Sequence, residues 1–250
     1  MSDLNHLLAL TDQYEQQLPP FPEDGVLVDP NLASTIDHTL LKAEGTIAQI
    51  EKLCVEAREN HFASVCVNGI FVARCAKLLQ GSGVPVCTVV GFPLGATPTR
   101  IKVAETRQAI TDGAKEIDMV IPVGMMKSGE YACVYEDIAQ ITEAAHAEGA
   151  LVKVILEMAY LSLREKILGC LLSKAAGADF VKTSTGFAAS GASVEDVRLM
   201  RSVVGPVQRM GVKAAGGIRT LSDARAMLGA GANRIGASAS LKILEEAKQQ

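Results

Sequence analysis

The sequence has no tryptophan, and aromatic residues make up only 4% of its 250 residues. It also has no excess of positive charge, since 24 lysines and arginines face 28 aspartates and glutamates and the formal net charge is −4. Proteins that bind the phosphate backbone of nucleic acids carry a basic patch, so this composition argues against a nucleic-acid partner. The apolar content of 48% suits one large α/β domain or two small ones.

Long apolar runs are missing as well. No segment approaches the roughly 20 consecutive apolar residues that span a bilayer. The N-terminus is acidic and lacks a small-residue cleavage site. We therefore expect a cytoplasmic protein with no membrane partner.

The cysteines and histidines do not form a metal-binding pattern. The six cysteines lie in apolar segments without paired close spacing, which favours reduced core thiols over disulfides or a zinc site. They are Cys54, Cys66, Cys75, Cys87, Cys133 and Cys170. No group of His, Asp and Glu has ligand spacing, so we expect no metal. His38 is the one histidine at a predicted strand end, and we interpret it as a hydrogen-bonded structural residue.

From residue 33 the chain alternates between short β-type runs and longer amphipathic runs, a pattern typical of βα units. The predicted strands lie near residues 34–39, 63–67, 85–91, 115–121, 151–157, 179–184, 211–215 and 233–236. The predicted helices lie near residues 46–60, 70–81, 98–112, 130–148, 162–176, 193–204, 221–230 and 239–248. Eight such units close most simply into a single (β/α)₈ TIM barrel, with a doubly wound open sheet as the alternative.

An extension precedes the barrel. Residues 4–18 place leucines and one tyrosine at roughly helical spacing, and the prolines in 19–22 end any helix. We therefore divide the chain into a helical extension with a Pro-rich linker, residues 1–30, and the barrel domain, residues 31–250. The extra helix is expected to pack against the barrel or a partner subunit, with a disordered tail as the alternative.

One lysine lies where lysine is unusual. Lys182 belongs to the segment Phe180-Val-Lys-Thr-Ser-Thr-Gly186, which is typical of a short buried strand that ends at a loop. Burial disfavours the charged form of an amine, so a lysine in such a place can act as a neutral nucleophile near pH 7. A lysine that extends from a strand end into water is the alternative.

Among the charged side chains within the other predicted strands are one aspartate, Asp118, and two further lysines, Lys153 and Lys213. Barrel enzymes carry their chemistry at the C-terminal strand ends. Because an unpaired buried charge is strongly disfavoured, we predict that these residues and Lys182 form a functional site, with a structural salt-bridge layer as the alternative. Periodicity alone does not fix whether they face the barrel interior, since both faces of a barrel strand are buried.

Glycines near the last two predicted strands indicate a phosphate site. Gly216 and Gly217 follow the seventh strand, and Gly236 and Ser238 follow the eighth, each just before a helix. Backbone amides at a helix N-terminus can hold a phosphate, and the loops after strands seven and eight are its usual place in such barrels. Glycine pairs also form ordinary turns, so neither pair alone is decisive.

These residues lie in motifs that resemble the 2-deoxyribose-5-phosphate aldolase family. The resemblance runs from about Ile36 to the C-terminal helix and leaves the first 30 residues outside it. Its strongest matches are Asp37-His-Thr-Leu-Leu-Lys42, Val65-Cys-Val-Asn68, Glu105-Thr-Arg-Gln-Ala-Ile110 leading to Glu116-Ile-Asp118, Phe180-Val-Lys-Thr-Ser-Thr-Gly186, and Val212-Lys-Ala-Ala-Gly-Gly-Ile-Arg-Thr220. Three positions depart from the pattern: Phe187 replaces a phosphate-facing lysine of some members, Ala214 a proline or serine, and Ala239 a serine.

The resemblance implies roles for individual residues. The Schiff-base lysine falls on Lys182, the second active-site lysine on Lys213, and the proton-relay aspartate on Asp118. The expected supporting residues are Lys153, Thr39 and the buried thiol of Cys66. The expected phosphate cradle consists of Gly186, Gly216, Gly217, Gly236 and Ser238.

The activity implied is that of a class I aldolase that needs neither a metal nor a cofactor. It would reversibly cleave 2-deoxy-D-ribose 5-phosphate to acetaldehyde and D-glyceraldehyde 3-phosphate, in deoxyribonucleotide catabolism. Its partners would be phosphorylated sugars and aldehydes, and a homodimer is compatible with the pattern. The alternatives are another lysine-dependent sugar-phosphate aldolase or isomerase on the same barrel, and a non-catalytic barrel that serves as a binding module.

Overall fold

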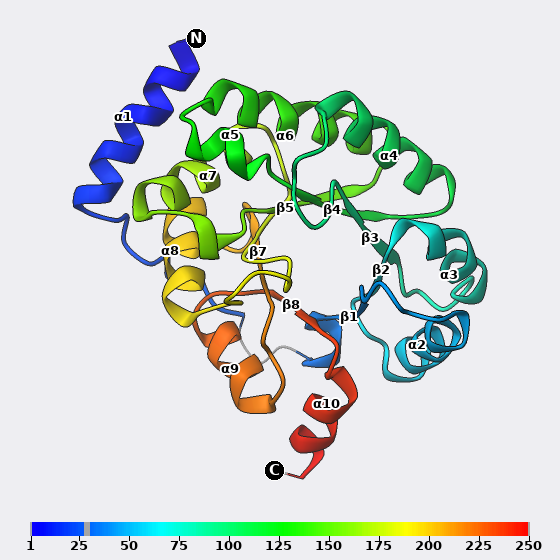
Figure 1. Cartoon of the computed structure of the whole chain (residues 1–250). Helices are drawn as coiled ribbons and strands as arrows, with labels where there is room; N and C mark the ends of the chain where they lie inside the picture. Colours follow the sequence, from blue (N-terminus) through cyan, green and yellow to red (C-terminus); the bar gives the residue numbers. More distant parts are fainter. Residues whose placement is uncertain (1, 28–30, 250) are drawn as a thin grey trace.

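The computed structural model describes residues 2–27 and 31–249, and its centre is a closed barrel of eight parallel strands. Each strand pairs with its neighbour in sequence, and β1 pairs with β8 to close the ring (Figure 1). The strands are β1 (Ile36–Leu40), β2 (Ser64–Val67), β3 (Val86–Val90), β4 (Glu116–Val120), β5 (Leu151–Ile155), β6 (Phe180–Lys182), β7 (Gly211–Ala215) and β8 (Arg234–Ala237). The predicted TIM barrel is confirmed, and the open sheet is wrong.

Helices alternate with the strands and surround the barrel (Figure 1). They are α2 (Ile47–Asn60), α3 (Val72–Leu78), α4 (Thr99–Thr111), α5 (Val123–Lys127), α6 (Tyr131–His146), α7 (Leu163–Ala175), α8 (Val194–Val204), α9 (Leu221–Gly229) and α10 (Ser240–Lys248). Local signals fix many of their ends. Thr46, Ser162 and Thr220 each form a capping box at a helix N-terminus. None of the described helices combines the length and apolar character needed to cross a bilayer.

The structure differs from the predicted elements at several places, of which these bear on the barrel. Residues 33–35 form a 3₁₀ turn before β1, and the predicted helix 70–81 begins as a second 3₁₀ turn, Gly69–Phe71, before α3. The strand β6 ends at Lys182, two residues earlier than expected. The short helix α5 was not predicted, because its five residues are fewer than a periodic pattern needs.

The strands turn alternate side chains outward and inward. Ile117, Val152, Val181 and Val212 are fully buried in the large apolar cluster between strands and helices. Their neighbours along each strand, among them Asp118, therefore face the barrel interior. The orientation that periodicity left open is settled: the four charged side chains of the predicted site share one interior layer.

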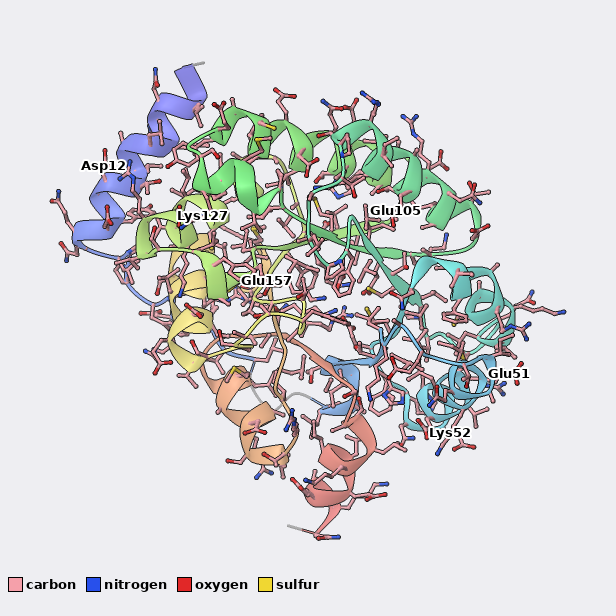
Figure 2. All side chains as sticks on the ribbon, viewed as in Figure 1. Asp12, Glu51, Lys52, Glu105, Lys127 and Glu157 are labelled. Atoms are coloured by element: carbon pink, nitrogen blue, oxygen red, sulfur yellow. The ribbon has the colours of Figure 1, made fainter. Side chains whose placement is uncertain are left out.

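The helix α1 (Ser2–Gln16) lies outside the barrel and packs on α7 (Figure 1). Arg164 of α7 pairs with Asp12, which lies on α1 at the edge of the molecule (Figure 2), and with Glu15 at 3.4 Å. Further along, the Phe21 ring lies 4.8 Å from the guanidinium carbon of Arg198 on α8. Of the two predicted partners for this helix, the structure shows the chain's own barrel. Residues 28–30 of the predicted linker lie outside the described residues.

Candidate active site

Three lysines from three neighbouring strands converge on one buried aspartate. Lys182 and Lys213 each place Nζ 2.7 Å from Oδ2 of Asp118, and Lys153 places Nζ 2.8 Å from Oδ1. The strand register sets this arrangement, because it aligns Asp118 with Lys153 and Lys182 with Lys213. All four residues are buried. The structure thus brings together the catalytic residues predicted from the sequence and Lys153.

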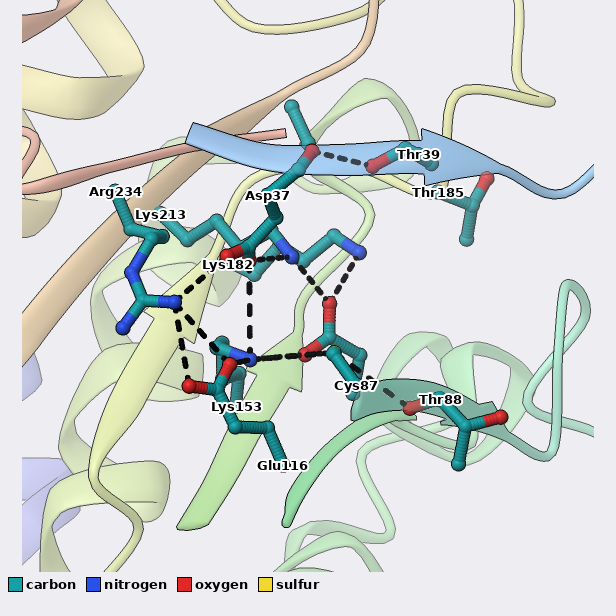
Figure 3. A network of polar contacts seen from close by, with 12 residues as sticks. Asp37, Thr39, Cys87, Thr88, Glu116, Lys153, Lys182, Thr185, Lys213 and Arg234 are labelled. Atoms are coloured by element: carbon teal, nitrogen blue, oxygen red, sulfur yellow. Dashed lines mark hydrogen bonds and ion pairs between the residues drawn. The ribbon is translucent and has the colours of Figure 1, made fainter. Parts of the chain in front are cut away.

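A second layer of charge lies toward the N-terminal strand ends. Asp37 forms an ion pair with Lys213 at 2.5 Å and accepts a hydrogen bond from Arg234 at 2.6 Å, while Glu116 lies 2.5 Å from Lys153 (Figure 3). The sequence analysis did not select Asp37, Glu116 or Arg234 as site residues. The available signal was spacing: Glu116 lies two positions before Asp118 and therefore shares its face of the strand.

The network contains four cationic side chains and three carboxylates. Lys153 makes three ion pairs, Lys213 and Arg234 make two each, and Lys182 makes one, to Asp118. If Lys182 is neutral, three cations face three carboxylates. The same balance holds whichever of the four cations is neutral, but the neutral form of Lys182 removes the fewest ion pairs.

The surrounding charges shift the protonation of these groups strongly. Burial alone would raise the pKa of Asp118, yet the ammonium groups of Lys153, Lys182 and Lys213 outweigh it and hold that pKa well below the usual range. Burial likewise opposes the charge on Lys213, but the carboxylates of Asp118 and Asp37 raise its pKa above that of an exposed lysine. Asp118 is thus held as a carboxylate and Lys213 as a cation.

A cavity of about 400 Å³ lies at the C-terminal ends of β1, β6, β7 and β8. Lys182 and Lys213 line it, so the charged network meets it directly. Its other described lining residues are Thr39, Leu40, Leu41, Lys42, Thr185, Gly186, Phe187, Ala215, Gly216, Gly217, Ile218, Arg219, Gly236, Ala237 and Ser238. These residues include the whole predicted phosphate cradle and Thr39. None of them carries a carboxylate, and the exposed cations Lys42 and Arg219 were not predicted.

The glycines of the cavity have backbone conformations or surroundings that disfavour a side chain. Gly216 and Gly217 have φ of +93° and +81°, in the left-handed region. A Cβ on Gly236 would lie 2.9 Å from Cβ of Ala215. The helix α10, which follows Ser238, has no side-chain cap on its first amides. The backbone here can approach a ligand closely and still has amide donors to offer.

Glu157 holds the loop after β6 in place. It has φ of +56°, which is rare for a residue other than glycine, and its side chain is buried. Its carboxylate accepts from the Thr185 amide at 3.3 Å and from the Thr185 hydroxyl, which in turn accepts from the Phe187 amide at 3.0 Å. The sequence analysis placed Glu157 in a strand and gave it no role, because a single residue in this conformation leaves no periodic signal.

The predicted supporting thiol of Cys66 is buried beside the network and does not line the cavity. Cys66 lies opposite Cys87 in the strand register, and the Cys87 thiol lies 3.1 Å from Asp118. Burial raises the pKa of Cys87, with further contributions from Cys66 and Asp118, which keeps this thiol protonated. A supporting role for Cys66 stays a prediction. His38 bonds to Ser240 and Glu56, each within 2.9 Å, as expected of a structural histidine.

Two groups of described residues bring potential metal-ligand atoms within 4.8 Å of one another. They are Cys66, Cys87 and Asp118, and Asp37, Cys87 and Glu116. Lysine ammonium groups already contact Asp118, Asp37 and Glu116, so the charge that a cation would supply comes from the protein itself. The donor set therefore fits a lysine-based site better than a metal centre.

The three departures from the family pattern lie in different surroundings. Phe187 lines the cavity, with its ring edge-to-face on Phe92 at a centroid distance of 5.3 Å. Ala214 faces the apolar cluster outside the barrel. Ala239 is the first residue before α10. Only Phe187 can touch a ligand in the cavity.

Known proteins with similar sequences are aldolases. The family model described as DeoC/LacD family aldolase matches residues 31–246. A deoxyribose-phosphate aldolase from Caldanaerobacter subterraneus subsp. tengcongensis is 57% identical over 88% of this chain and 95% of its own. One from Thermococcus gammatolerans is 54% identical over 89% of this chain and 99% of its own.

Solved structures agree with the sequence matches. A candidate deoxyribose-phosphate aldolase from Coccidioides immitis superposes with a TM-score of 0.90 and 42% identity, covering 98% of each chain. The tetrameric deoxyribose phosphate aldolase from Aeropyrum pernix gives a TM-score of 0.80 and 36% identity, covering 87% of this chain and 91% of its own. The chain therefore belongs to the DeoC/LacD family of aldolases and is a lyase of the deoxyribose-phosphate aldolase type.

Proposed function

We propose that the chain reversibly cleaves 2-deoxy-D-ribose 5-phosphate to acetaldehyde and D-glyceraldehyde 3-phosphate through a Schiff base on Lys182. One observation carries this proposal: Lys182 lines the cavity, and within the described part of the chain its only ion pair is to Asp118 at 2.7 Å. The amine thus lies next to both the substrate's space and a carboxylate that can exchange protons with it. A metal-free, cofactor-free site and a cytoplasmic location belong to the same proposal, while a homodimer stays a prediction.

The first half of the reaction forms the iminium. The neutral Lys182 amine attacks the C1 aldehyde of the open-chain sugar, and a new C–N bond forms. Loss of water from the carbinolamine requires a proton on the departing oxygen. Asp118 lies within hydrogen-bond reach of Nζ and moves that proton, directly or through one water molecule. Lys213, held as a cation, favours the neutral form of its neighbour.

The second half breaks the carbon–carbon bond. A base removes the proton of the C3 hydroxyl, the C2–C3 electron pair flows into the iminium, and D-glyceraldehyde 3-phosphate leaves. The enamine that remains on Lys182 takes up a proton at C2 and is hydrolysed to acetaldehyde, which frees the amine. We assign the removal of the C3 hydroxyl proton to Asp118. Burial raises the pKa of Asp118, but three lysines outweigh this effect and lower it, so the side chain is a carboxylate that can accept the proton. Lys153 stays paired with Asp118 at 2.8 Å and fixes its orientation.

The phosphate of the substrate fits the glycine-rich end of the cavity. The backbone at Gly186, Gly216, Gly217 and Gly236 and the hydroxyl of Ser238 line this end. Amides of such loops and of a helix N-terminus favour bound anions. The absence of any carboxylate among the described lining residues adds to the preference for an anionic ligand.

The experiment is to measure the products with the purified chain and with a Lys182→Met variant. The wild type should release acetaldehyde and glyceraldehyde 3-phosphate in equal amounts, and the variant should release neither. Lys166→Met is the matched control, because Lys166 pairs with Asp196 at 2.6 Å on the outer helices. Wild-type condensation of dihydroxyacetone phosphate instead of acetaldehyde would indicate a different aldolase, and an active Lys182→Met variant would contradict the Schiff base.

A further inference from the structure

Lys42 is a cation of the cavity with no ion-pair partner among the residues that the structure describes. It follows β1 and the cavity residues Leu40 and Leu41, and it is exposed. Among the described residues no carboxylate lies within ion-pairing distance of its Nζ. The other cavity lysines differ in this respect, because Lys182 and Lys213 contact Asp118 and Asp37 at 2.5–2.7 Å.

The remaining cation of the cavity is Arg219, and its surroundings partly offset its charge. The carboxylate of Asp223 accepts hydrogen bonds from the backbone amides of Arg219 and Thr220, both at 3.0 Å. A negative group thus lies next to the Arg219 backbone and forms the capping box of α9. Lys42 has no such neighbour among the contacts of the described residues.

The wall of the cavity that follows Gly186 carries no charge. Phe187 lines it with a neutral ring that is 55% exposed and packs edge-to-face on Phe92. A phosphate monoester carries a charge of about −1.5 to −2 near pH 7. Backbone amides alone supply partial charges, whereas a hydrogen bond from an ammonium group is roughly twice as strong as a neutral one. A cation elsewhere in the cavity would therefore strengthen phosphate binding beyond what the amides supply.

We propose that Lys42 supplies this cation and determines the preference for phosphorylated over non-phosphorylated sugars. This inference rests on the proposed function, because it assigns the charge partner of that substrate's phosphate. Lys42 lines the cavity from the loop after β1. The loop after β6 contributes the neutral ring of Phe187 there and no cation. Lys42 neutralises the phosphate and takes no part in the bond-breaking steps at Lys182.

The test compares Lys42→Met with Lys77→Met, a control that removes an exposed lysine of α3 outside the cavity. Each variant is assayed for kcat/KM on 2-deoxyribose 5-phosphate and on 2-deoxyribose. Lys42→Met should lower the value for the phosphorylated sugar about 10- to 100-fold, as expected for loss of a hydrogen bond from a charged donor, and that for the plain sugar far less. Lys77→Met should change neither.

A second variant asks whether charge, and not shape, is what Lys42 contributes. Because Phe187 lines the same cavity, Lys42→Met combined with Phe187→Lys should recover most of the preference for the phosphorylated sugar. Calorimetric titration with inorganic phosphate gives a readout without turnover. Binding should weaken in Lys42→Met, return in the double variant and stay unchanged in Lys77→Met.

Other outcomes would overturn the proposal. If Lys42→Met lowers kcat/KM equally for both sugars, Lys42 shapes the mouth of the barrel and does not bind the phosphate. If Lys42→Met keeps the preference for the phosphorylated sugar and Arg219→Ala loses it, the role belongs to Arg219. Unaltered phosphate binding in Lys42→Met would also refute it. Failure of the wild type to cleave either sugar would instead contradict the proposed function, and the phosphate titration would still decide whether Lys42 binds the anion.

Discussion

Replacing Asp118 by asparagine removes one negative charge from the point where the side chains of three lysines meet. Their nitrogens lie 2.7, 2.7 and 2.8 Å from its oxygens, and the side chain is fully buried. Asparagine keeps the size of the side chain but can neither carry the charge nor accept a hydroxyl proton. The change therefore separates the electrostatic role of this residue from its shape.

Two magnitudes follow from this geometry. Removal of one partner from a buried ion pair costs about 3–5 kcal/mol, and loss of a general base costs about 10²- to 10⁴-fold in rate. We thus expect Asp118→Asn to lose about 3–5 kcal/mol in free energy of unfolding near pH 7. Its turnover should fall by at least about 100-fold, while the iminium on Lys182 still forms slowly.

The loss of stability should depend on pH with a defined sign. The pKa of Asp118 in the folded protein is lowered, since three lysines outweigh the effect of burial. The carboxylate therefore stabilises the fold above its unfolded pKa of about 3.9, and this contribution is lost as the pH falls toward the folded value. The difference in free energy of unfolding between wild type and Asp118→Asn should be largest above pH ~5 and narrow below pH ~4.

The assay is urea unfolding at several pH values beside steady-state cleavage and borohydride trapping. Asp137→Asn is the matched control, because Asp137 is also buried and pairs with a buried lysine, Lys102, at 2.7 Å outside the site. The control should lose stability and keep its turnover per folded molecule. Turnover of Asp118→Asn within about tenfold of wild type would assign the proton transfer to another group. An equal loss in the control would show that any disturbed buried ion pair stops the reaction.

Three further changes test other parts of the site. Lys213→Leu should lower kcat about 100-fold and move the acidic limb of the pH–rate profile to higher pH, because a cation beside the nucleophile is gone; an unchanged profile would contradict this role. Gly217→Val adds a side chain where a Cβ meets no atom within 4 Å, so it should extend into the cavity. KM for the phosphorylated sugar should then rise far more than KM for plain deoxyribose, and equal damage would mean that Gly217 serves the turn, where its φ of +81° already favours glycine. Glu157→Gln should raise KM several-fold with little change in melting temperature, since a neutral acceptor holds the Thr185 amide less firmly. Thr185→Val should reproduce the effect. A normal KM in either variant would show that other contacts hold the loop.

The barrel could be predicted because each βα unit carries its own local signals. The four glycines of the Gly-Ala pairs that precede β4, β5, β6 and β8 all have positive φ, as expected at helix C-termini. They are Gly113, Gly149, Gly177 and Gly231. Such signals lie within a few residues of one another, so no knowledge of tertiary contacts is needed to find them.

The charged network could be predicted only in part. Lys182, Lys213 and Asp118 stand out because a charge within a buried strand is costly wherever it points. Their partners Asp37 and Arg234 lie near strand ends, where exposure is equally compatible with the sequence. Only closure of the barrel, which pairs β1 with β8, shows that both point inward and meet at 2.6 Å.

The loop residues were the hardest to predict. Lys42 and Arg219 lie outside regular elements, so neither periodicity nor burial singles them out. Their placement depends on how the loops after β1 and β7 fold over the barrel, which is a tertiary property. Both lie within matched motifs, but only the structure shows that they line the cavity.

The covalent intermediate on Lys182 is the central claim, and trapping it is the most direct test. The protein is incubated with acetaldehyde and sodium borohydride, digested, and mapped by mass spectrometry. The account predicts a reduced two-carbon adduct, an ethyl group on Nζ of Lys182, that is absent in Lys182→Met and does not move to Lys213 or Lys153. No adduct in the active wild-type enzyme, or an adduct on another lysine alone, would contradict it.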